Sequence, residues 1–151
     1  MFTHINEDNR PTMVDVGDKA VTHRTASARA VVIFPEEAFK SGEDVLQTKK
    51  GPVVDTAIVA GVLAAKRTHE FIPFCHLIPL EDCSITIEWN TARELVIQCS
   101  VRATHKTGVE MEALVAVTTA CLALYDMAKA IDRELRIENI RLVRKQKEAA
   151  T

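Results

Sequence analysis

The sequence predicts an α+β fold in which one four-stranded antiparallel sheet carries two helices on one face. Two observations predict it: strand-like apolar alternation and helical apolar spacing each recur, and their order is strand, helix, strand, strand, helix, strand. This is the ferredoxin-like βαββαβ arrangement. With 151 residues, 47% of them hydrophobic, the chain suffices for one core. We expect a single domain over residues 28–144, an N-terminal arm at 1–27 and a polar tail at 145–151.

The first half of the pattern is one strand and one helix. A run of apolar residues predicts a strand over 28–34. Pro35-Glu-Glu then opens a short helical turn, and a polar loop runs from Lys40 to Gly51. Pro52 suits the first position of a helix, because its missing N–H has no partner there, and we expect this helix to reach about His69. Gly61 and several alanines make the helix thin, so another backbone can approach it closely.

The second half begins with two strands that alternate between apolar and polar side chains, around 83–89 and 95–103. The short polar stretch 90–93 between them predicts an antiparallel hairpin with one buried face. A long helix is expected from about Val109 to Asp132, and a last strand over 135–143. The apolar stripe expected along the long helix is Leu114, Thr118, Cys121, Tyr125 and Ala128.

Charge and composition exclude several classes of function. The 19 Lys and Arg against 21 Asp and Glu give a net charge of -2, which argues against nucleic acid or an anionic membrane as a partner. The N-terminus lacks a secretory pattern, and no apolar run reaches the roughly 18 residues that a membrane span needs. We therefore expect a cytoplasmic protein whose four cysteines are free thiols.

Four short clusters hold side chains able to bind an anion or move a proton. Each also has an ordinary explanation, because cations near a helix end and acids near a helix start complement the helix dipole. The clusters are Lys49-Lys50-Gly51, Lys66-Arg67, Phe74-Cys75-His76 and Lys106 to Glu112.

Two other kinds of chemistry are open for the segment around His76. His69, Cys75, His76 and Cys83 are potential metal ligands, but their spacing fits none of the usual zinc patterns. Cys75 as a nucleophile beside His76 is the second alternative, although no helix start is expected there to stabilise its thiolate.

Asp126 and Lys129 form the most informative pair, since residues three apart on a helix are neighbours on its surface. On a solvated face they would be a weak ion pair, whereas in a cleft they would be an acid and a base. Glu112 lies about 21 Å from Asp126 along the same helix. If both act on one ligand, we expect two subunits to contribute to each pocket.

Taken in order, these clusters resemble the cyclic pyranopterin monophosphate synthase family of molybdenum cofactor biosynthesis. The resemblance spans nearly the whole chain. Six stretches carry it: Met13 to Val16, Lys50-Gly51, Ala57 to Thr68, Ile72 to His76, Lys106 to Leu114, and Tyr125 to Ala130.

The resemblance implies a lyase that converts 3',8-cyclo-7,8-dihydroguanosine 5'-triphosphate, a cyclised GTP derivative, to cyclic pyranopterin monophosphate with release of diphosphate. It implies a homo-oligomer, a hexamer built as a trimer of dimers, that acts after a radical enzyme supplying the substrate. No cofactor and no metal is implied, although the sequence leaves Mg²⁺ possible. Asp126 and Lys129 match the catalytic residues. The matching substrate-pocket residues are Lys50, Lys66, Phe74, Cys75, His76, Glu110, Met111, Glu112, Lys145 and, from the adjacent subunit, Arg24.

The chain departs from the family pattern at three places. Leu77 follows His76 where many members have proline, Thr104-His105 replaces a Gly-Lys-like pair, and Arg144 stands before Lys145 where a small residue is common. Two rival functions stay open at this point: a non-catalytic module that binds nucleotides or a partner enzyme, and a purely structural oligomer.

Overall fold

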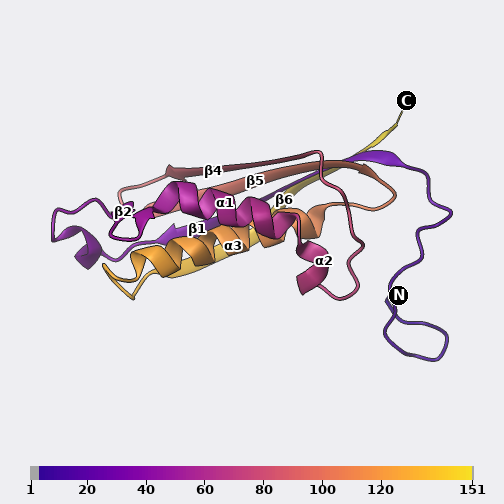
Figure 1. Ribbon diagram of the computed structural model, residues 1–151, viewed down its shortest axis with the longest axis horizontal. Coiled ribbons are helices and arrows are strands. Elements are labelled where there is room, and N and C mark those ends of the chain that lie inside the picture. Colours follow the sequence, from indigo (N-terminus) through magenta and orange to yellow (C-terminus); the bar gives the residue numbers. More distant parts are fainter. Residues whose placement is uncertain (1–3, 151) are drawn as a thin grey trace.

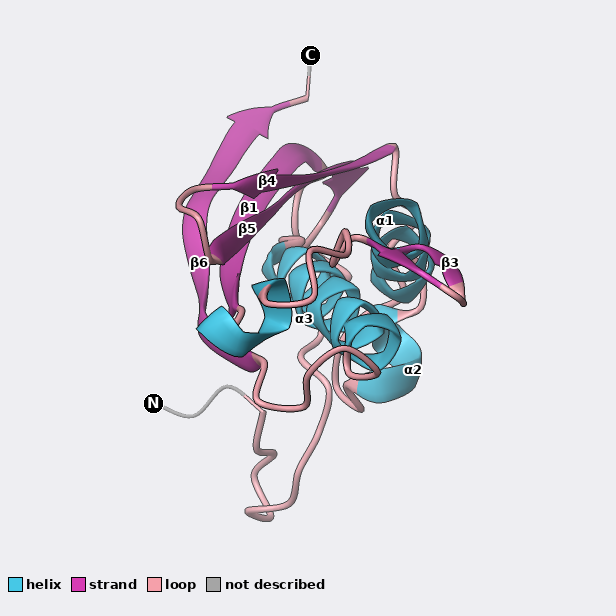
Figure 2. Cartoon of the chain, turned by 90° about the vertical axis from the view of Figure 1, so that its left-hand side faces the viewer, coloured by secondary structure: helices cyan, strands magenta, loops and turns pink. Residues whose placement is uncertain are grey.

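Four strands form one antiparallel sheet in the computed structural model, which describes residues 4–150. They are β1 (Thr22–Ile33), β4 (Asp82–Trp89), β5 (Glu94–His105) and β6 (Arg136–Ala149), and they lie in the order β4-β5-β1-β6. Helices α1 (Val53–Ala65) and α3 (Glu110–Ala128) cover one face of this sheet (Figures 1 and 2). The predicted α+β, ferredoxin-like arrangement is confirmed.

Four shorter elements lie between the main ones. The single-turn helix η1 (Glu36–Phe39) and the two-stranded hairpin of β2 (Gln47–Thr48) and β3 (Gly51–Pro52) lie between β1 and α1. The short helix α2 (Thr68–Phe71) follows α1 and begins the connection to β4. This hairpin holds Lys50, one of the predicted site residues, in its turn.

The core lies between the sheet and the two helices. Alternate residues of β5 point into it and are almost fully buried, from Leu95 to Ala103, which confirms the predicted alternation. Of the expected stripe on α3, Cys121 and Ala128 are buried. The buried apolar residues of this helix are Ala113, Ala116, Val117, Ala120, Cys121, Leu124, Met127 and Ala128. Leu114, Thr118 and Tyr125 are half-buried beside them.

The two helices approach each other closely where α1 carries Gly61. A Cβ atom at this position would lie 2.5 Å from Ile85 Cδ1 and 2.9 Å from the backbone oxygen of Ala116. There is therefore no room for a side chain at this position. The low helix propensity of glycine is offset by the close packing that it permits. The helices run antiparallel, because Lys50, before α1, contacts Asp126, near the end of α3.

Four expected boundaries were wrong. The first strand begins at Thr22 instead of residue 28, because residues 22–27 pair with β5 on one side and with β6 on the other. The last strand runs to Ala149, so most of the expected tail 145–151 belongs to the sheet. Strand β6 lies at the edge with mostly exposed side chains, and so lacks the apolar alternation that marks a strand. The helices α1 and α3 end at Ala65 and Ala128, earlier than expected.

By length and composition α3 would pass as a membrane-spanning helix, yet half of it is buried in this fold against the sheet and α1. Residues 4–21 form an arm without helix or strand that leaves the start of β1 and folds back beside the N-terminal end of α3 (Figure 1).

Candidate active site

Three charged side chains, Lys50, Asp126 and Lys129, meet at the C-terminal end of α3 and are here called the lysine–aspartate cluster. Lys129 Nζ lies 2.7 Å from Asp126 Oδ1, and Lys50 Nζ lies 3.2 Å from Asp126 Oδ2. Lys50 also donates a hydrogen bond of 3.1 Å to the Asp126 backbone carbonyl. The β2–β3 turn brings Lys50 there, and Gly51 permits that turn because it adopts a φ of 114°.

The two ammonium groups hold the pKa of Asp126 below its ordinary value, first through the hydrogen bond from Lys129 and then through that from Lys50. Asp126 is therefore a carboxylate at neutral pH. All three side chains are about half exposed, so the pairs contribute little to stability. They place a proton acceptor beside two proton donors on a surface that a ligand can reach.

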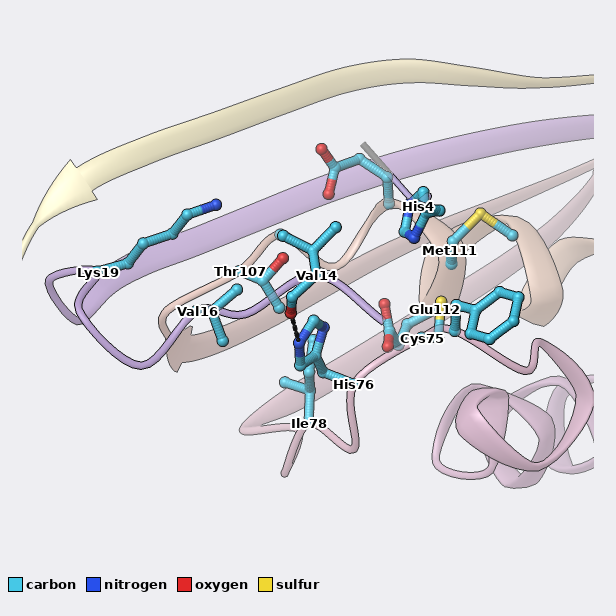
Figure 3. Close-up of a pocket in the computed structure, with 13 residues that line it drawn as sticks. His4, Val14, Val16, Lys19, Cys75, His76, Ile78, Thr107, Met111 and Glu112 are labelled. Atoms are coloured by element: carbon cyan, nitrogen blue, oxygen red, sulfur yellow. Dashed lines mark hydrogen bonds between the residues drawn. The ribbon is translucent and has the colours of Figure 1, made fainter. Parts of the chain in front are cut away.

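A pocket of about 330 Å³ opens beside the N-terminal end of α3 (Figure 3). Three parts of the chain form its wall: the arm, the loop after α2, and the start of α3 with the residues before it. Figure 3 shows the arm passing across the pocket above His76. The lining residues of this Glu112 pocket are His4, Val14, Val16, Lys19, Phe74, Cys75, His76, Ile78, Thr107, Gly108, Glu110, Met111 and Glu112.

Glu112 is the buried acid of this pocket, with only 3% of its surface exposed. Burial raises its pKa to about 7, and the negative charge of Glu110 adds to this, while a backbone hydrogen bond opposes it. A carboxyl group that titrates near neutral pH can either donate or accept a proton under physiological conditions. The pocket therefore contains a group suited to holding a hydrogen-bonding ring edge or exchanging a proton with it.

His76 and Cys75 also line the Glu112 pocket. His76 Nε2 donates a hydrogen bond of 2.7 Å to the Val14 carbonyl, which leaves Nδ1 as the acceptor nitrogen of the neutral ring. Burial, and then the charge of Glu112, raise the pKa of the Cys75 thiol. A raised pKa keeps the thiol protonated, whereas a nucleophilic cysteine must be a thiolate. The alternative of Cys75 as a nucleophile is therefore not supported.

A smaller hollow of about 210 Å³ adjoins the start of α3 and contains Arg24, Glu110 and Lys145. Lys145 Nζ lies 3.1 Å from Glu110 Oε1, and Arg24 Nη2 donates a hydrogen bond of 3.2 Å to the Lys106 carbonyl. Within residues 4–150, the buried Arg24 Nε has no hydrogen-bond partner. Arg24, Lys145 and Lys147 line the hollow, which therefore offers three cations and an unused donor to an anionic group.

Lys66 lies in a third place, a groove of about 550 Å³ formed by the end of α1 and residues 77–83. Ile78 lines both this groove and the Glu112 pocket, so the two are neighbours on either side of one loop.

The structure thus distributes the twelve predicted site residues over separate places in one chain. Lys50, Asp126 and Lys129 meet at one end of α3, and the remaining residues except Lys66 gather at its other end. The roles assigned to these residues stay predictions. Lys19, Val14 and Thr107 also line the Glu112 pocket and were missed, although they adjoin or lie within stretches that carried the resemblance.

Over the described range 4–150, no three His, Cys, Asp or Glu side chains come together in an arrangement that could hold a metal ion. The combination of His69, Cys75, His76 and Cys83 therefore finds no support as a metal site. The four cysteines are free thiols.

Comparison with known proteins gives a consistent result. The model of the MoaC family matches residues 13–148. A protein from Xanthomonas campestris pv. campestris (strain B100), named cyclic pyranopterin monophosphate synthase, is 47% identical over 146 residues, which cover 96% of this chain and 88% of that protein. A protein of the same name from Herpetosiphon aurantiacus is 48% identical over 144 residues, covering 93% and 85% of the two chains.

A longer relative has a second part. The molybdenum cofactor biosynthesis bifunctional protein of Synechocystis is 42% identical over 151 residues, which cover 96% of this chain but only 43% of that protein.

Proposed function

Because this chain belongs to the MoaC family, we propose that it is a lyase of molybdenum cofactor biosynthesis that forms cyclic pyranopterin monophosphate. Its substrate is the cyclised GTP derivative named above, and diphosphate is the second product. The observation that carries the proposal is the near-complete match, since the family model spans residues 13–148. We assign no resident cofactor to the chain.

The lysine–aspartate cluster supplies the proton transfers of this reaction. Opening and rebuilding the purine-derived ring requires protons to be removed from and delivered to nitrogen and carbon. Asp126, held as a carboxylate, is the acceptor, and Lys129, 2.7 Å away, is the donor. Lys50 contacts the other carboxylate oxygen and adds positive charge for the triphosphate.

The Glu112 pocket holds the ring end of the substrate. Glu112, with the Met111 backbone, matches the donor edge of a guanine-derived ring, and Phe74 and Cys75 line the pocket beside it. His76 offers its Nδ1 atom as one further acceptor. The pocket volume of about 330 Å³ is at the lower end of the range for small-molecule sites.

The triphosphate requires cations. Forming the cyclic phosphate creates a bond from a hydroxyl oxygen to the α-phosphorus, with the hydroxyl proton passing to a base of the site. It breaks the bond between that phosphorus and the diphosphate, which leaves with the negative charge. Arg24 and Lys145 beside the Glu112 pocket, Lys66 in the adjoining groove and Lys50 are the cations we assign to this charge.

Both ends of α3 act on one substrate only if two copies of the chain contribute to each site. Glu112 and Asp126 are about 21 Å apart along the helix, too far for one compact ligand. Between these ends the helical layer exposes apolar side chains, with Val59 58%, Leu63 48% and Leu122 56% exposed. Their burial in a twofold interface would bring one copy's cluster toward its partner's pocket. We extend this to a hexamer built from three such dimers.

The setting of the reaction follows from its substrate. We place the enzyme in the cytoplasm, downstream of the radical enzyme that makes the cyclised GTP derivative. The bifunctional relative supports a second enzyme of the same pathway as a functional partner.

Incubation of the purified protein with the cyclised GTP derivative tests the function. We expect diphosphate and cyclic pyranopterin monophosphate to appear in equal amounts. Binding of the substrate without diphosphate release would instead identify a non-catalytic binding module.

A further inference from the structure

We infer that Lys106 is a positioning residue, which fixes residues 14–19 of the arm across the Glu112 pocket and thereby sets the affinity for the substrate. This inference rests on the proposed function. Residues 14–19 are called the strap below.

The strap forms one wall of the Glu112 pocket. Val14, Val16 and Lys19 all line it, and Figure 3 shows the strap crossing the pocket with Val14 joined to His76. A tight turn shapes the strap: the Gly17 N–H donates to Asp15 Oδ1 at 2.7 Å, and the Lys19 N–H donates to the Val16 carbonyl at 3.1 Å. The strap has no helix or strand to hold it in place.

Within residues 4–150, two side-chain hydrogen bonds join the strap to the rest of the fold. Lys106 Nζ donates to the Gly17 carbonyl, and His76 Nε2 donates to the Val14 carbonyl. His76 itself lines the pocket, whereas Lys106 does not. Lys106 is therefore the anchor that can be removed without removing a pocket side chain.

Lys106 is also held at its own backbone. Its carbonyl accepts a hydrogen bond of 3.2 Å from Arg24 Nη2, which connects the strap through Lys106 to strand β1. The three residues after Lys106 lead directly into Glu110 at the start of α3. One lysine thus links three parts of the site: the strap, Arg24, and the segment that carries Glu110 and Glu112.

A strap that is already fixed costs no further ordering entropy when the substrate binds. Removing the anchor adds this cost to binding and so weakens the affinity for the substrate. The chemical groups that act on the substrate keep their positions. A variant lacking the Lys106 ammonium should therefore raise KM and leave kcat nearly unchanged.

The test compares the full-length wild type with Lys106→Met, Lys106→Arg and the control Lys40→Met. Among the residues that the structure describes, Lys40 pairs with Glu37 alone, on the surface. Hydrogen–deuterium exchange of the ligand-free proteins reports on the strap directly. We expect strap amides to exchange about tenfold faster in Lys106→Met, and at nearly the wild-type rate in the other two. Unchanged exchange in Lys106→Met would overturn the inference.

Steady-state kinetics with the cyclised GTP derivative then tests the consequence. We expect KM to rise about tenfold in Lys106→Met while kcat stays within about threefold, with Lys106→Arg restoring KM. Faster exchange with an unchanged KM would also overturn the inference. If the wild type showed no turnover, the proposed function would fail, and the exchange experiment would still decide whether Lys106 holds the strap. Should Lys106→Met lose its far-UV circular dichroism, Lys106→Gln takes its place under the same criteria.

Discussion

Asp126 and Glu112 lie on the same helix, yet their surroundings shift the pKa values of the two carboxyl groups in opposite directions. Two lysines lower the pKa of Asp126, whereas burial raises that of Glu112 to about 7. Two carboxyl groups whose pKa values are shifted in opposite directions can take different roles in proton transfer. Asp126 is ionised at neutral pH and is therefore available as a proton acceptor, whereas Glu112 can exchange a proton near neutral pH.

Replacing Asp126 tests its role at the residue scale. In Asp126→Asn the carboxylate is lost while the shape is kept, so we expect kcat to fall by a factor of about 100 to 10,000. The free energy of unfolding should change by less than about 1 kcal/mol, because the pair is exposed. Diphosphate release and urea denaturation measure the two effects, with the exposed Asp55→Asn as the control. Near-normal turnover in Asp126→Asn would refute the assignment.

The raised pKa of Glu112 predicts a pH dependence of stability. Its pKa is about 7 in the folded chain and near the ordinary 4.5 when unfolded, so between these values the folded state binds more protons. The free energy of unfolding therefore falls as pH rises through this window, by at most about 3 kcal/mol from this residue.

Glu112→Gln removes that contribution. Urea denaturation at pH 4.5 and pH 7.5 should show the variant gaining stability relative to the wild type as the pH rises. If the free energy of unfolding changed equally with pH in the two proteins, Glu112 would not be desolvated in the folded chain.

At the scale of elements, the predictable helices and strands are those with apolar side chains on a buried face and polar side chains on an exposed face. The hairpin of β4 and β5 was predicted because one face of each strand packs on the helices. The ends of β1 and β6 were missed, because residues 22–27 and 144–149 are stabilised by pairing with each other and carry mostly polar side chains. Backbone hydrogen bonds between strands do not require apolar side chains, so the pattern of apolar residues does not reveal them.

The same reasoning applies to the site. Residue types and order within the chain identified Asp126, Lys129, Glu112 and His76 as candidates. The place of Lys19 was not predictable, because it depends on how the arm, a segment without regular structure, folds across the pocket. Nor could spacing alone bring Lys50 to Asp126, since that contact depends on the β2–β3 turn and on the antiparallel packing of α1 and α3.

Packing between α1 and α3 gives a prediction at this scale. Alanine favours a helix over glycine by about 1 kcal/mol, but the Cβ atom of Gly61→Ala would meet Ile85 and the Ala116 backbone oxygen. We expect the variant to be less stable than the wild type by about 1–3 kcal/mol. Urea denaturation measures this, and a stability equal to or above that of the wild type would contradict the close helix contact.

At the scale of the whole molecule, the proposed function makes the two ends of α3 complementary halves of one site. The single chain holds the lysine–aspartate cluster at one end and the Glu112 pocket at the other, with exposed apolar side chains between them. An assembly of copies explains all three features together, because a twofold interface covers the apolar surface and joins unlike halves.

Leu122 provides a test of that assembly. It is 56% exposed on α3 in the single chain, so Leu122→Glu should leave the fold intact. Within an interface, however, the new charge would be costly, and we expect dissociation to smaller species with loss of turnover. Analytical ultracentrifugation and circular dichroism follow the two properties. Leu122→Ala should keep the assembly, and an active, fully assembled Leu122→Glu protein would place the interface elsewhere.

Mixing two inactive variants tests the central claim most directly, namely that each site combines Asp126 from one copy with Glu112 from another. Asp126→Asn and Glu112→Gln, each expected to have little turnover alone, are coexpressed with different tags, and diphosphate release is measured. Random pairing makes half of the dimers mixed, each with one intact site, so about a quarter of wild-type turnover should return. If the mixture stays as inactive as its components, the two halves of the site do not come from different copies.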